Sequence, residues 1–129
     1  MEDPTRAVSR SESLPKETRL AKRREFLHVY ENGRKLFSRF SVLFFAANNL
    51  PYSRIGITAT KKIGKANVRN KLKRWTREVY RRERYPLALD ERSIDVVVNL
   101  KANAVNATFD DYRGDLSRAL ARVAEQSRG

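Results

Sequence analysis

The chain has 129 residues, of which 40% are hydrophobic, which is enough for one modest core and excludes disorder throughout. It has no Cys, so disulfides and thiolate zinc sites are excluded. The formal net charge of +13 predicts a polyanionic partner, with nucleic acid ahead of an anionic membrane. No apolar run approaches the roughly 20 residues of a membrane-spanning helix, and the start lacks the apolar centre of a signal peptide, so we expect a cytoplasmic protein.

The first part of the chain divides into an arm and a helix. Residues 1–15 are polar, with several Ser, Arg and Pro, which is typical of a disordered or flexible basic arm. The segment 16–129 is expected to form a single RNA-binding domain. Apolar residues at spacings near three and four predict a helix over 16–32, with Gly33 as its stop.

Three strand-like runs follow, over 35–38, 40–47 and 52–60. The second is rich in aromatic and β-branched residues, and the third alternates between apolar and polar positions. A short polar loop with two Asn and a Pro joins these two runs. We therefore expect them to pair as a hairpin.

The segment 61–84 carries most of the excess charge. It holds eleven basic and two acidic residues, a local charge of +9. A helix is predicted over 66–84, because four apolar residues spaced four, three and four apart form one stripe on it: Val68, Leu72, Trp75 and Val79. The basic side chains fall on the opposite side. A charge run usually marks a solvated helix face, but few acids are interleaved here for salt bridges, so we interpret the run as a docking surface for phosphates.

The remaining segments complete an α+β pattern. Residues 93–100 are mostly apolar and predict a buried strand. Thr108 is expected to cap a last helix over 109–124. The order helix, three strands, helix, strand, helix predicts an α+β sandwich with one four-stranded sheet. The strands on either side of the basic helix form a β–α–β unit, so these two strands are expected to lie parallel.

The sequence offers no evident catalytic set. The one His, His28, falls in the first predicted helix, where a partly buried or surface position is the simplest interpretation. Asp110 and Asp111 are adjacent, and helix capping explains them better than a metal site. Neither the Asp90-Glu91 pair nor Asp95 has a partner at ligand spacing, and the Gly-rich phosphate-loop pattern is absent. We therefore expect binding rather than catalysis by the side chains, and the sequence leaves open whether the protein itself holds a metal.

Two binding surfaces are predicted. The first is the basic helix with its approach loop, where Lys61, Lys62 and Lys65 and the free helix N–H groups could converge on phosphates. The second is aromatic, from the first helix and the strand 40–47. It comprises Phe26, Tyr30, Phe40, Phe44 and Phe45, of which strand alternation places Phe40 and Phe44 on one face and Phe45 on the other. Exposed rings could stack unpaired bases; for any single Phe a plain core position is the favoured alternative.

The basic segment also carries a recognisable signature. The run from Lys61 to Ala66, then Val68 to Arg74, then Arg77-Glu78 resembles the bacterial ribonuclease P protein subunit. Upstream residues resemble the same family's first helix and third strand: Arg19-Leu20, Arg24-Glu25-Phe26, Asn32-Gly33 and Tyr52 to Ile57. One departure is Lys71, where the family's motif usually has Arg, so the bidentate fork of a guanidinium is absent there.

The resemblance implies an enzyme in which a large RNA is the catalyst and the protein is an accessory. Such a ribonucleoprotein is an endonuclease that removes the 5′ leader of precursor tRNA by hydrolysis, with Mg²⁺ held mainly on the RNA. It implies one protein per catalytic RNA, and a β–α–β crossover of the unusual left hand. The positions that would face RNA are Lys61, Lys62, Lys65, Arg69, Asn70, Lys71, Lys73, Arg74 and Arg77. The positions that would hold the leader are Phe26, Tyr30 and Phe44.

Three other readings share some of these features. A ribosomal protein or general RNA chaperone would have the same charge but no leader-binding cleft. A DNA-binding module is less favoured, because no helix-turn-helix or dimer signal is present. An independent protein nuclease is least favoured, for want of an acid/base set.

Overall fold

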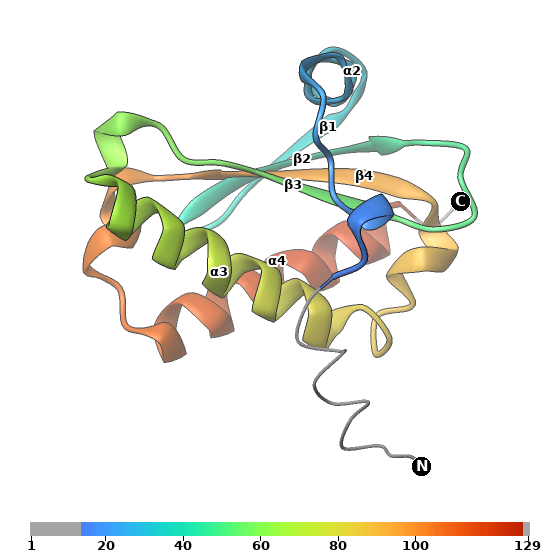
Figure 1. Cartoon of the computed structure of the whole chain (residues 1–129). Helices are drawn as coiled ribbons and strands as arrows, with labels where there is room; N and C mark the ends of the chain where they lie inside the picture. Colours follow the sequence, from blue (N-terminus) through green and yellow to red (C-terminus); the bar gives the residue numbers. More distant parts are fainter. Residues whose placement is uncertain (1–13, 128–129) are drawn as a thin grey trace.

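The computed structural model describes residues 14–127, which form one sheet with helices on both of its faces (Figure 1). The helices are α2 (Arg23–Asn32), α3 (Ala66–Glu83) and α4 (Phe109–Gln126). The strands are β1 (Arg34–Phe37), β2 (Ser41–Ala47), β3 (Arg54–Thr58) and β4 (Ile94–Leu100). The short 3₁₀ turn η1 (Lys16–Thr18) precedes α2, and three more lie between the later elements: η2 (Lys61–Ile63), η3 (Leu89–Arg92) and η4 (Ala102–Asn106). The predicted α+β class and element order are confirmed, and none of the described helices is long and apolar enough to cross a membrane.

The strand order is β1-β2-β4-β3, so the expected hairpin between the second and third strands is wrong. The hairpin is formed by β1 and β2, and β4 lies between β2 and β3. The reason is burial: Val96, Val97 and Val98 are fully buried, and only a central strand is covered on both faces. The parallel pairing of β3 with β4 is confirmed.

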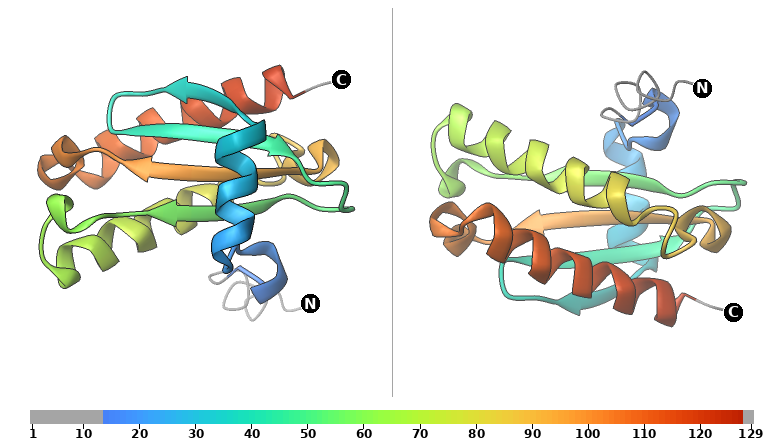
Figure 2. Two further views of the ribbon diagram at one scale, coloured as in Figure 1. Left: turned by 90° about the horizontal axis from the view of Figure 1, so that it is seen from above. Right: turned by 90° about the horizontal axis from the view of Figure 1, so that it is seen from below.

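The connection from β3 through α3 to β4 has the left hand that the family resemblance implied. In the two views of Figure 2, α3 lies on the opposite face from α2, and the chain passes from the edge strand β3 to the central β4 in the left-handed sense. About 98% of such crossovers are right-handed.

The first helix starts later than predicted. Residues 16–18 form η1, and the chain then runs extended beside β3, where the Leu20 N–H donates to the Ile55 carbonyl at 2.9 Å. Helix α2 begins only at Arg23, because one Glu25 carboxylate oxygen accepts from the N–H groups of Ala21 and Lys22 at 2.9 Å each and caps the turn. The arm prediction falls mostly on residues 1–13, which lie outside the described part; Leu14 is buried in the core.

Two apolar cores result, one on each face of the sheet. The larger lies between the sheet and helices α3 and α4 and contains the predicted stripe of α3, to which the buried Thr76 and Tyr80 add. The smaller lies under α2 and is centred on Leu20, Val29 and Val97. Helix α4 buries Leu116, Leu120 and Val123, and the hydroxyl of Thr108 accepts from the backbone N–H of Asp111 at 3.1 Å, as the predicted cap requires.

Candidate nucleic-acid interface

The loop before α3 presents its cations to solvent. Ile63 is buried and anchors η2, while Lys61, Lys62 and Lys65 are exposed. Gly64 has φ of +150°, which favours glycine and lets the chain turn sharply into α3. No side chain caps the N-terminus of α3, and its first turn has no acid. The predicted cluster of lysines beside helix N–H groups is therefore present at this end of α3.

Helix α3 carries most of its predicted RNA-facing residues on two rows. Asn70 and Arg74 are exposed on the outer surface. Arg69, Lys73 and Arg77 are half-buried and spaced four apart, so they share the side of the helix that borders β3. The basic face is thus wider than a single stripe.

Lys71 lies apart from both of these rows. Its ammonium is 5.0 Å from the centroid of the Trp75 ring, which in turn packs edge-on against Phe109 of α4. A cation over an indole face is favourable, so this lysine has a structural role at the α3–α4 boundary. Lys71 is therefore half-buried beside Trp75, whereas its neighbours Asn70 and Arg74 are exposed.

On the other face of the sheet, Phe26 of α2 lies directly over Gly56 of β3. A Cβ at residue 56 would stand 2.8 Å from Cε2 and Cζ of the Phe26 ring and 3.0 Å from a methyl group of Leu20. Only a residue without a side chain allows this approach. Gly56 therefore leaves the space in which the ring of Phe26, a predicted leader-binding residue, packs on the sheet.

Tyr30 and Phe44 form a second aromatic contact on the same face. Their rings meet edge-on with centroids 4.9 Å apart, and the Tyr30 hydroxyl donates to Oδ1 of Asn99 at 2.8 Å. Both side chains are half-buried at the margin of the small core under α2. The structure thus brings Phe26, Tyr30 and Phe44 onto one surface with part of each ring accessible.

Two aromatic residues of the predicted surface belong to the core instead. Phe45 and Phe40 are 3% and 4% exposed and lie in the larger core on the α3–α4 side. The expectation that Phe40 shares a face with Phe44 is wrong, because β2 begins at Ser41 and the alternation does not extend into the preceding bend. There Asp115 accepts the N–H of Phe40 at 3.1 Å and fixes its direction.

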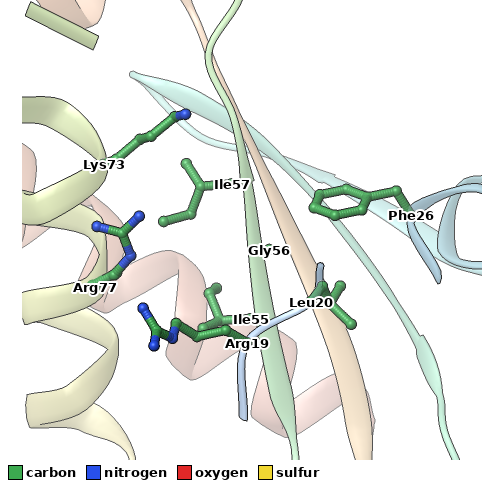
Figure 3. A pocket seen from close by; sticks show the side chains of 8 residues that line it. All are labelled: Arg19, Leu20, Phe26, Ile55, Gly56, Ile57, Lys73 and Arg77. Carbon is green, nitrogen blue, oxygen red and sulfur yellow. The ribbon is translucent and has the colours of Figure 1, made fainter. Parts of the chain in front are cut away.

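A cavity of about 200 Å³ joins the two predicted surfaces at the edge of β3 (Figure 3). Lys73 and Arg77 reach it from α3, Phe26 from α2, and Ile55, Gly56 and Ile57 form its floor. Arg19, on the extended segment before α2, completes the cationic side. Arg19 could not be assigned to a site from the sequence, because only the long-range pairing of this segment with β3 brings it here.

The cavity is cation-rich. Burial, and then the charge of Arg19, lower the pKa of the Arg77 guanidinium, which nonetheless remains charged at neutral pH. Within residues 14–127 no carboxylate pairs with Arg19, Lys73 or Arg77. Three unneutralised cations over an apolar floor form a site suited to a phosphate attached to an apolar or aromatic group.

An ion-pair network under α2 holds the aromatic surface in place. Arg54 of β3 donates to both carboxylate oxygens of Asp95 at 2.8 and 2.7 Å and to Glu25 of α2 at 3.0 Å. Asp95 is 2% exposed, so its charge depends on this pairing. The partner of Asp95 could not be predicted from sequence spacing, because Arg54 lies on the parallel neighbour strand.

His28, Asp90, Asp110 and Asp111 lie in surface or helix-capping positions or in ion pairs, not in a catalytic arrangement. His28 is exposed on α2 beside Asn32, and Asp110 and Asp111 lie in the first turn of α4. Asp90 accepts from the N–H of Ser53 and from Arg84. In the described part of the chain, no three acidic or His side chains are grouped so that they could hold a metal ion.

Comparison with known proteins matches this arrangement to one family. The family model described as Ribonuclease P matches residues 14–124. The chain is 42% identical over 117 residues to the ribonuclease P protein component of Thermotoga maritima, covering 88% of this chain and 97% of that relative. It is 33% identical over 112 residues to the corresponding protein of Syntrophus aciditrophicus, covering 85% and 90%.

Solved structures of ribonuclease P proteins have the same fold. The ribonuclease P protein from Thermotoga maritima superposes with a TM-score of 0.73 at 36% identity, covering 81% of this chain and 96% of that one. The Staphylococcus aureus protein superposes with a TM-score of 0.76 at 27% identity, covering 86% and 98%. Since the family model spans nearly all of the described fold and the relatives align over almost their whole length, this chain belongs to the ribonuclease P protein family.

Proposed function

We propose that the chain is the protein subunit of an RNA-based ribonuclease P, in which it binds the catalytic RNA and the 5′ leader of precursor tRNA. The observation that carries this proposal is the cavity at the β3 edge, where Lys73 and Arg77 of the basic helix meet Phe26 of the aromatic surface. One protein can then touch two RNAs at once. In this arrangement the protein assists endonucleolytic removal of the leader to give the mature 5′ end.

The catalytic RNA is assigned to the surface of η2 and α3. Its exposed cations and Asn70 can meet phosphates and sugar hydroxyls of a folded RNA without reading its sequence. Binding of this kind releases counterions, so it weakens steeply with salt. The exposed Lys61, Lys62, Lys65 and Arg74 contribute most to this salt dependence.

The leader is assigned to the face that carries α2. Phe26, Tyr30 and Phe44 offer ring surface to unpaired bases, and stacking on such rings tolerates any base. Lys73 and Arg77 meet phosphates of the same strand at the cavity. A protein that processes many precursors needs this kind of recognition, since leaders differ in sequence.

The hydrolytic chemistry is assigned to Mg²⁺ ions held mainly on the RNA subunit. The described side chains provide binding and orientation, and their acids serve caps and ion pairs rather than an acid/base pair. We propose one protein per catalytic RNA, in the cytoplasm, where precursor tRNA is processed.

The direct test mixes the purified protein with the catalytic RNA of the same organism at low Mg²⁺ and measures leader removal. Stimulation is expected because the protein positions the leader while few ions are available to do so. An RNA whose cleavage rate is unchanged by saturating protein would overturn the proposal.

Two variants test the assigned surfaces. Arg74→Ala should weaken binding of the catalytic RNA and lower the salt slope by about one counterion, whereas Arg122→Ala, which removes the same charge from the exposed side of α4, is the matched control. Phe44→Leu keeps apolar volume but removes the aromatic face, so it should weaken binding of precursor tRNA more than of mature tRNA. Equal losses for both tRNAs would favour a general RNA chaperone.

A further inference from the structure

Phe37 at the end of β1 is the most exposed phenylalanine for which the structure describes a place, with 62% of its surface accessible. It lies on the same face of the sheet as α2, because its neighbour Leu36 points into the larger core on the other face. A large apolar ring in such a position contributes little to folding. Because Phe37 points to the same face of the sheet as the partly accessible rings of Tyr30 and Phe44, we infer that its ring has a binding role.

The strand register places Phe37 next to the proposed leader site. Lys35 is directly opposite Phe44, and Phe37 is opposite Val42, so Phe37 and Phe44 are diagonal neighbours on one face. Diagonal positions of this kind are about 7–8 Å apart. The two rings are therefore spaced so that neighbouring bases of one extended strand could reach them.

A single cation lies between the two rings. The Lys35 ammonium is 5.6 Å from the centroid of Phe37 and 5.4 Å from that of Phe44. No carboxylate of residues 14–127 forms an ion pair with it. An ammonium between two ring surfaces is placed to bind the phosphate that links two stacked bases.

We propose that Phe37 and Lys35 form an additional subsite for the single-stranded leader, one nucleotide beyond Phe44 on the side away from the β3 cavity. This rests on the proposed function. The path then crosses the sheet from Phe26 over β3, past Phe44 on β2, to Phe37 on β1. Because the catalytic RNA is assigned to α3 beside β3 and cuts at the 3′ end of the leader, the β1 end of the path receives the nucleotides nearer the leader's 5′ end.

The test varies the length of the leader. Precursor tRNAs with leaders shortened one nucleotide at a time from the 5′ end are bound to the holoenzyme formed with wild type, Phe37→Leu or Phe44→Leu. Phe37→Leu is expected to weaken binding of long leaders by about fivefold or more, the lower end for one stacked base. The loss should disappear at a leader length at which Phe44→Leu still weakens binding. Lys35→Gln should show the same length threshold as Phe37→Leu.

The outcomes separate this inference from the function on which it rests. A leader-dependent loss with Phe44→Leu but none with Phe37→Leu at any length overturns the subsite alone. No leader-dependent loss with either variant overturns the leader assignment itself. Since β1 is an edge strand, sedimentation of wild type and Phe37→Leu tests a second copy of the chain as the occupant. A wild-type dimer that Phe37→Leu dissociates, with leader binding unchanged, overturns the proposal in favour of that interface.

Discussion

The close contact between Gly56 and Phe26 gives a prediction whose size follows from the coordinates. The new methyl group of Gly56→Ala would stand 2.8 Å from two carbons of the Phe26 ring, whereas ordinary contact begins near 3.4 Å. The ring must therefore move by at least about 0.6 Å, and the methyl group of Leu20, at 3.0 Å, limits its escape. Overpacking of a closed site costs typically 1–3 kcal/mol, and we expect Gly56→Ala to lower the free energy of unfolding by about 1–2 kcal/mol.

A double-mutant cycle measured by urea unfolding isolates this contact. In a Phe26→Ala background the ring is gone and only the Leu20 methyl group at 3.0 Å remains close, so adding Gly56→Ala should cost clearly less than in wild type, and the coupling energy should be about 1 kcal/mol or more. Gly114→Ala in α4 is the matched control, since its methyl group would meet only the end of Arg118 at 3.4 Å and should stabilise the helix by about 0.5–1 kcal/mol. An equal penalty for Gly56→Ala in both backgrounds would refute the reasoning.

Three further predictions concern stability and use the midpoint of urea unfolding. Arg54→Met leaves Asp95 buried without its main partner and should cost about 3–5 kcal/mol, part of which a second change, Asp95→Asn, recovers; a single variant as stable as wild type would contradict this. Partial burial of Glu25 opposes its charged form, but two backbone N–H groups and Arg54 outweigh it and lower the pKa of Glu25 below 4.5. The ionised form therefore stabilises the fold near neutral pH, and the advantage of wild type over Glu25→Gln should shrink as the pH falls through and below 4.5; a constant difference would rule this out. Thr108→Ala should cost about 1 kcal/mol through the lost cap of α4, while Thr108→Ser should not; equal stability of the two variants would argue against the cap.

The helices were predictable because their signals are local. The stripe on α3 and the cap of α4 each depend on residues within a few turns of one another, and both predictions are confirmed. The start of α2 was missed because Glu25 reaches back to cap a turn that begins without Ser, Thr, Asp or Asn, and because the segment before it pairs with β3 instead. That pairing depends on residues more than thirty positions away.

Strand pairing depends on the whole fold, so the local sequence pattern predicted the strands but not which strands pair. A polar loop between 40–47 and 52–60 fits a hairpin equally well whether or not another strand is later inserted between them. The insertion of β4 is driven by the need of Val96 to Val98 for cover on both faces. The same change of neighbours gives Asp95 its partner Arg54, which no spacing along the chain could have indicated.

The left-handed crossover explains how the two predicted surfaces can be distinct and still meet. With β3 at the edge and β4 beside it in parallel, the hand of the connection decides which face of the sheet α3 covers. A right-handed connection would place the basic helix over the face of Phe26, Tyr30 and Phe44 and bury those rings. The left hand places α3 on the other face, where its apolar stripe completes the larger core, and leaves its row of Lys73 and Arg77 at the β3 edge. The cavity between cations and Phe26 is therefore a consequence of chain topology. Under the proposed function, the rare hand would give a single-stranded RNA a continuous path from the basic helix onto the aromatic face.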